Sequence, residues 1–132
     1  MKAITNLMIY EWDMKDRDWL GYRLQKGDIF TYHHNLLAKR DGGEETIKNG
    51  AILCEKTAHP YLHIIEGRDY ELFLYLTNLL AKVNEQGFMP TKQQLLAIDA
   101  VLRQFEREHQ EDRTRKGKLL IKQEFIQDRS YS

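Results

Sequence analysis

The amino-acid sequence predicts an α+β fold in which a β-hairpin and the helix after it carry an N-terminal segment and an antiparallel helical extension. Two short runs of β-forming residues flank a loop that contains Gly42 and Gly43. Pro60 then marks a helix start, because proline suits the first helical turn. Two apolar patterns of helical period follow.

The length and composition indicate one folded domain. A chain of 132 residues is too short for two cores, so we expect a single domain over 1–132, with a functional motif at about 23–68 and the helical extension at about 69–132. A hydrophobic content of 42% with 30% charged residues excludes the disordered classes. No apolar run reaches the roughly 20 residues of a membrane span, and the first residues lack the order of a signal peptide. We therefore expect a cytoplasmic protein without a membrane partner.

The hairpin is the most informative part of the sequence. Residues 29–33 and 51–54 read as strands, and 35–50 reads as an unusually long loop between them. Loops of about 15 residues in a compact domain are more often functional than idle. The segment 1–22 before the hairpin has apolar residues without a clean period, and we expect it to pack on the rest as a short strand or helix.

The second half of the sequence predicts two paired helices. The first runs from about Pro60 to Val83, and Gly67 weakens its middle and could kink or break it. Thr91 and Gln94 have the form of a capping box and open a second amphipathic helix, which should pair with the first in antiparallel fashion. The tail from Glu111 on could be a third helix, a strand, or a segment ordered only by a partner.

The charge balance does not by itself support binding to nucleic acid. Twenty basic and 20 acidic residues give zero net charge, and the tail 111–132 carries six basic against four acidic residues. Attraction to a polyanion must therefore come from the local placement of charge.

Four of the five histidines lie in one window of 31 residues. His59 and His63 are four residues apart at a helix start, a spacing at which two imidazoles face the same ion. His33 and His34 are adjacent on a strand and therefore point to opposite sides. Each pair alone is more often structural than catalytic. The fifth histidine, His109, reads as a solvated residue in a charged helical run.

The joint order of these elements, HHNLLAKRDGGEETIKNGAILCEKTAHPYLH at 33–63, resembles the HNH endonucleases. The resemblance is closest to the His-His variety and implies their ββα-metal motif. It implies that His33, His59 and His63 bind one divalent ion, which could be zinc, nickel, manganese or magnesium. It makes His34 the general base and Asn49 the residue that fixes the loop, although Asn49 could also be an ordinary turn residue before Gly50. Many family members have flanking cysteine pairs for a structural zinc, whereas Cys54 is the only cysteine of this chain.

The function that follows is metal-dependent hydrolysis of DNA phosphodiester bonds. Lys39, Arg40, Lys48 and Arg68 are candidates for contacts to DNA phosphates, although charges on an exposed loop are solvated by default. The alternative is a non-catalytic nucleic-acid-binding or phage assembly module that keeps the same fold. The helical half, 69–132, could in addition dock on a protein partner. The sequence leaves the oligomeric state open.

Overall fold

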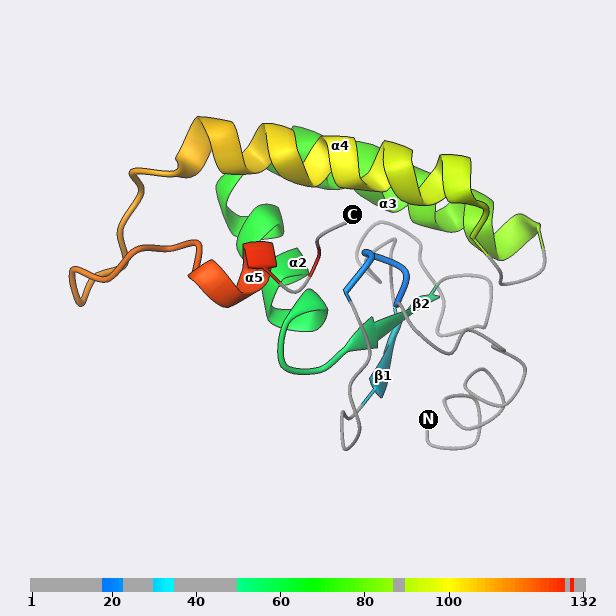
Figure 1. Ribbon diagram of the computed structural model, residues 1–132, viewed down its shortest axis with the longest axis horizontal. Coiled ribbons are helices and arrows are strands. Elements are labelled where there is room, and N and C mark those ends of the chain that lie inside the picture. Colours follow the sequence, from blue (N-terminus) through cyan, green and yellow to red (C-terminus); the bar gives the residue numbers. More distant parts are fainter. Residues whose placement is uncertain (1–17, 23–29, 35–49, 87–89, 128, 130–132) are drawn as a thin grey trace.

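The computed structural model describes residues 18–22, 30–34, 50–86, 90–127 and 129, with the side chains of 30–34, Gly50 and Ile52 outside this description. Figure 1 shows the arrangement. Within these residues there are two strands and four helices, namely β1 (Phe30–His34), β2 (Gly50–Cys54), α2 (Ala58–Arg68), α3 (Tyr70–Glu85), α4 (Lys92–His109) and α5 (Gln123–Gln127). The described part of the chain is therefore mostly helical with a small strand component, which places it broadly in the α or α+β class.

The two strands pair as the sequence indicates. β1 and β2 are antiparallel, with Phe30 opposite Cys54 and His33 opposite Ala51. Both strands begin and end within one residue of the predicted bounds. Helix α2 follows β2 after three residues, so the order of strand, strand and helix is present. The loop 35–49 lies outside the described residues.

The single helix predicted from Pro60 to Val83 is wrong, because two helices occupy this stretch. The break is at Asp69, where the backbone φ of −147° is not helical. The Asp69 side chain accepts a hydrogen bond from the Leu72 backbone N–H at 3.1 Å and so caps α3. Gly67 lies inside α2, one residue from its end. The side-chain cap of Asp69 therefore sets the position of the helix break. Gly67, although a weak helix former, does not interrupt α2.

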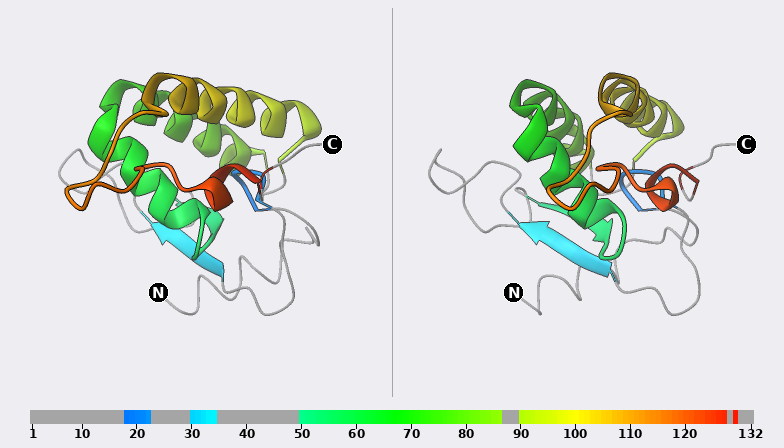
Figure 2. Two further views of the ribbon diagram at one scale, coloured as in Figure 1. Left: turned by 60° about the vertical axis from the view of Figure 1, so that its left-hand side comes forward. Right: turned by 90° about the vertical axis from the view of Figure 1, so that its left-hand side faces the viewer.

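Helices α3 and α4 form the predicted antiparallel pair. They lie side by side in all three views, and α2 lies between this pair and the strands (Figures 1 and 2). The capping box is also confirmed: the Gln94 N–H donates to the Thr91 hydroxyl at 3.1 Å, and the Thr91 N–H donates to the Gln94 side chain at 2.9 Å.

The tail after α4 folds back on the protein. Arg113 and Leu119 form an isolated antiparallel bridge, and the short helix α5 follows. Phe125 of α5 is buried, and its carbonyl accepts a hydrogen bond from the Tyr22 hydroxyl at 2.7 Å. The sequence left a third helix, a strand or a partner-ordered segment open for the tail. The tail forms an ordered turn and then the short helix α5, and it packs on the body of the protein itself.

The buried side chains of the described residues form one apolar cluster. It contains Trp19 and Leu20 from the N-terminal segment, Leu53 from β2, and residues of α2, α3, α4 and α5. In the described part of the chain, no helix combines the length and apolar character needed to cross a membrane.

Candidate functional site

Two of the predicted metal ligands meet on the first turns of α2. The Nε2 atoms of His59 and His63 are 3.3 Å apart. Their rings meet edge to face, with centroids 4.9 Å apart and an interplanar angle of 61°. Residues four apart share one face of a helix, and α2 begins three residues after β2, so the sequence fixes both the spacing and the place of this pair.

The surroundings of the pair orient the His63 ring and favour the neutral form of His59. His63 Nδ1 lies 3.3 Å from the Glu66 Oε1, which orients the ring through the nitrogen that does not face His59. The pKa of His59 is lowered, first by burial and then by the charge of His63, against the opposing effect of Glu55. The neutral form of histidine is the form that binds a metal.

For the strand histidines His33 and His34, the structure describes the backbone alone. His33 and His34 are consecutive in β1, opposite Ala51 and Gly50 of β2, and consecutive strand residues face opposite sides. Their side chains are outside the described residues, as are Asn49, Lys39, Arg40 and Lys48 altogether. The convergence of His33 on the α2 pair and the separate role of His34 therefore stay predictions.

Arg68, the fourth predicted phosphate contact, lies at the other end of α2. Its Nη2 donates to the Arg113 carbonyl at 3.4 Å, and its Nη1 is 3.9 Å from the Asp112 carboxylate. The side chain is 43% exposed. Arg68 thus joins α2 to the tail while keeping part of its guanidinium accessible.

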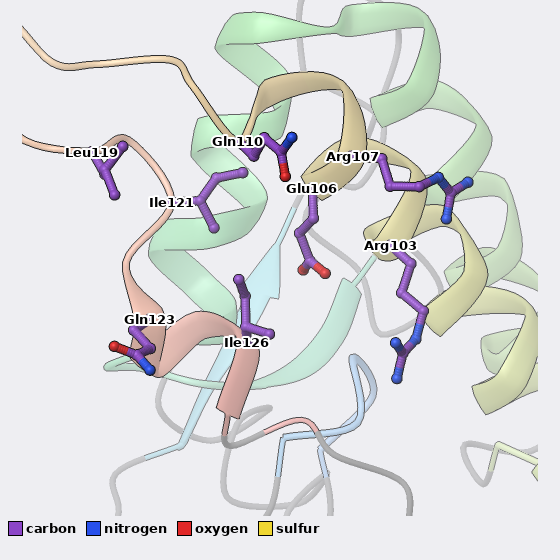
Figure 3. A pocket seen from close by; sticks show the side chains of 8 residues that line it. All are labelled: Arg103, Glu106, Arg107, Gln110, Leu119, Ile121, Gln123 and Ile126. Carbon is purple, nitrogen blue, oxygen red and sulfur yellow. The ribbon is translucent and has the colours of Figure 1, made fainter.

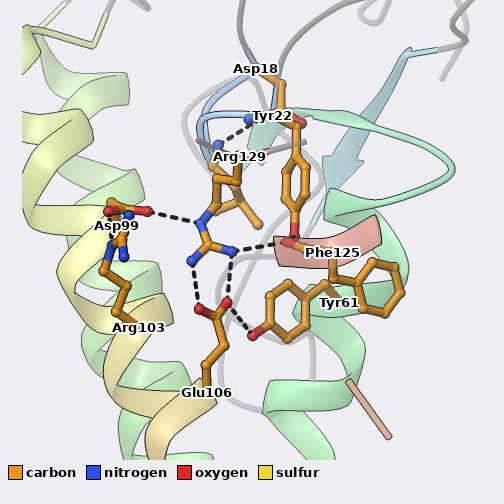
Figure 4. Close-up of polar contacts among 9 residues, drawn as sticks. Asp18, Tyr22, Tyr61, Asp99, Arg103, Glu106, Phe125 and Arg129 are labelled. Carbon is orange, nitrogen blue, oxygen red and sulfur yellow. Dashed lines mark hydrogen bonds and ion pairs between the residues drawn. The ribbon is translucent and has the colours of Figure 1, made fainter. Parts of the chain in front are cut away.

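A buried ionic cluster that the sequence did not indicate joins α2, α4 and the tail (Figure 4). Arg129 is 2% exposed and pairs with Asp99 at 2.9 Å and with Glu106 at 2.7 Å. Glu106 also accepts a hydrogen bond from the Tyr61 hydroxyl at 2.8 Å, and burial, the first cause, raises the pKa of Tyr61. Tyr61 is the middle one of the three residues between His59 and His63 on α2. The cluster therefore fixes the helix face opposite to the histidine pair.

Asp18 is a second missed residue that positions the site. It is fully buried, and its carboxylate accepts hydrogen bonds from the backbone N–H groups of Leu20, Tyr22 and Cys54 at 2.8 to 3.0 Å. Burial raises the pKa of Asp18 to about 7, against the lowering effect of these donors. The bond to Cys54 holds the end of β2, from which the chain enters α2.

The prediction for His109 is wrong, because this residue is not simply solvated. Its ring stacks on Phe105 at 4.4 Å, and its Nδ1 is 2.6 Å from the Asp112 carboxylate. His109, Asp69 and Glu108 also offer ligand atoms within 4.8 Å of one another. This group could hold a metal, but Asp69 already caps α3, and exposed acidic groups are common without an ion.

An open pocket of about 510 Å³ lies between α4 and the tail (Figure 3). Ile121 and Ile126 provide apolar walls, and Arg103 and Arg107 extend from α4 at one side. None of the residues predicted for catalysis or metal binding lines it.

No family model matches the chain, and the comparisons with curated proteins and with solved structures gave no significant match.

Proposed function

We propose that this protein is a metal-dependent endonuclease of the HNH type that hydrolyses DNA phosphodiester bonds. The observation that supports this most directly is the 3.3 Å separation of the His59 and His63 Nε2 atoms. Two nitrogens bound to one zinc ion at about 2.0–2.1 Å in tetrahedral geometry are about 3.3–3.4 Å apart. The pair is thus spaced as two ligands of one ion, on a helix that directly follows an antiparallel strand pair.

A direct hydrogen bond between the two rings is the competing explanation of this contact. At 3.3 Å the two nitrogens are at the long end of hydrogen-bond distances, so the bond between the rings is weak. The two ring nitrogens already have the spacing of two ligands of one ion, so an ion can replace this contact with little movement of either ring.

Each residue has a distinct part in the proposed reaction. His33, His59 and His63 hold one divalent ion, which when bound stabilises negative charge on the phosphate and the leaving oxygen. His34, the next residue of the strand after His33, takes a proton from the attacking water, which suits an imidazole with an ordinary pKa of about 6.5. Asn49 holds the loop backbone that orients His34. Lys39, Arg40, Lys48 and Arg68 contact neighbouring phosphates.

The test is cleavage of supercoiled plasmid by the purified full chain with Mg²⁺, Mn²⁺, Ni²⁺ or Zn²⁺, with and without EDTA. We expect cleavage that EDTA abolishes and that His34→Ala lowers by about 10²–10⁴-fold without loss of metal binding. His63→Ala should weaken metal binding itself. Metal binding without cleavage under any condition would instead favour a non-catalytic nucleic-acid-binding module.

His109→Gln is the matched control for the metal assay. It removes the described histidine that lies outside the α2 pair but belongs to the group with Asp69 and Glu108. Metal affinity should be unchanged in this variant. If His109→Gln abolishes binding and His63→Ala does not, the ion is held between α3 and α4, and the proposed catalytic centre is wrong.

A further inference from the structure

The tail contains the densest concentration of positive charge in the described part of the chain. Residues 113–123 include five basic residues and no acidic one, in a protein whose net charge is zero. All five side chains are exposed. They are Arg113, Arg115, Lys116, Lys118 and Lys122.

The first four of these residues lie on an ordered turn. The Thr114 N–H donates to the Lys118 carbonyl at 2.8 Å, and the Gly117 N–H donates to the Thr114 carbonyl at 3.0 Å. Gly117 has a φ of +78°, a conformation that residues with a Cβ rarely adopt. The Arg113 side chain crosses the turn and donates to the Gly117 carbonyl at 3.0 Å. The spacing of the charges is therefore fixed by the fold before any ligand arrives.

Both ends of the basic turn 113–118 are anchored to the body of the protein. After the turn, Ile121 and Phe125 are buried in the core. Before it, Arg68 at the end of α2 donates to the Arg113 carbonyl. Arg68 lies five residues beyond His63, which is about 7.5 Å along the helix axis. The turn thus leaves the protein at the far end of the helix that carries the histidine pair, and Figure 1 shows it projecting from that end of the molecule.

The charge of the turn is not compensated within the part of the chain that the structure describes. There, no carboxylate pairs with Arg115, Lys116, Lys118 or Lys122, whereas Arg103 and Arg129 each have an acidic partner. Like charges held close together repel one another, and a polyanion relieves this repulsion.

We propose that the basic turn 113–118, together with Lys122, is a docking surface for the phosphate backbone of duplex DNA. The inference rests on the proposed nuclease function for the identity of the polyanion. Lysine and arginine contacts to phosphates position a duplex without reading its sequence. A membrane surface fits less well, because the turn 113–118 has no apolar side chain and a single leucine beside it, Leu119, is a shallow anchor for a bilayer.

The test is binding of a fluorescent DNA duplex, measured by anisotropy in EDTA over a range of salt concentrations. The double variant Lys116→Gln, Lys118→Gln removes two charges from the turn. If each contact contributes about 0.9 to the slope of log affinity against log salt, the slope should flatten by about 2 and affinity at 0.1 M salt should fall about 50-fold. The matched control is Lys82→Gln, Lys92→Gln, which removes two exposed lysines of α3 and α4 and should change the slope little.

Equal losses in the two double variants would overturn the inference, since net charge alone would then explain them. The charge-preserving variant Lys116→Arg, Lys118→Arg should bind like the wild type, and a loss there would indicate damage to the fold. The last measurement uses vesicles of equal parts phosphatidylserine and phosphatidylcholine. If the Lys116→Gln, Lys118→Gln variant loses binding to these vesicles but not to DNA, the proposal is also overturned. Because binding is measured in EDTA, it succeeds or fails independently of plasmid cleavage.

Discussion

Replacing Arg129 by methionine should destabilise the protein far more than replacing Arg103, although both arginines pair with Asp99. The Arg129 side chain is 2% exposed, and that of Arg103 is 58% exposed. Loss of the buried partner leaves the carboxylates of Asp99 and Glu106 largely removed from water, with only Arg103 and the Tyr61 hydroxyl to compensate them. Breaking a buried ion pair in this way costs about 3–5 kcal/mol.

Arg103→Met is the control for this comparison. An exposed pair contributes about 0–1 kcal/mol because water screens it, so Arg103→Met should lower the free energy of unfolding by no more than that. A domain of this size has a total stability of about 5–15 kcal/mol, so Arg129→Met removes a large share of it. Urea unfolding followed by tryptophan fluorescence measures both changes, since Trp19 is fully buried.

A rescue experiment separates the charge effect from lost packing. Glu106→Gln in the Arg129→Met background neutralises one of the stranded carboxylates, and part of the lost stability should return. The reasoning fails if Arg129→Met and Arg103→Met agree to within 1 kcal/mol. It also fails if the added Glu106→Gln change makes the protein less stable still.

Three further outcomes are expected. Burial raises the pKa of Asp18 to about 7, against about 3.9 in the unfolded chain. Between these two pH values the folded protein holds one proton more than the unfolded chain. The free energy of unfolding should therefore fall by about 1.4 kcal/mol per pH unit as the pH rises. Asp18→Asn should remove this slope in urea titrations at pH 4.5 to 7. Thr91→Ala removes the capping box of α4 and should cost about 0.5–2 kcal/mol by the same assay, with Lys92→Ala as a neutral control. Zinc at 100 times its dissociation constant should add about 2.7 kcal/mol to wild-type stability in thermal unfolding and nothing to His63→Ala.

The local features of the fold were accessible from the sequence. The capping box joins residues three positions apart, and each strand and helix of the two pairs has its own apolar or β-forming pattern within the element; all three features are confirmed. The break at Asp69 was missed because the glycine nearby suggested the break at the wrong position, although aspartate is a strong cap. The spacing of His59 and His63 was readable because four residues make about one helical turn.

The buried cluster could not be predicted in the same way. Arg129 lies in a polar stretch of the tail, and its partners Asp99 and Glu106 are 30 and 23 residues away. Nothing in a local pattern distinguishes a buried arginine from an exposed one, because the distinction depends on which segments pack together. His109 was misjudged for the same reason, since its stacking on Phe105 is local but its enclosure depends on the fold of the tail.

The hydrogen bond from Tyr22 to Phe125 spans 103 residues and so has a consequence for biosynthesis. Helices α3 and α4 are neighbours in the chain and can associate while translation continues, since contacts of short sequence separation form fastest. The link between Tyr22 and α5 must wait until residue 125 has been added. A chain cut short before residue 125 lacks the buried Phe125, and the apolar surface that Phe125 covers is then exposed to proteases and chaperones. The last part of the core therefore closes only after α3 and α4 have been made.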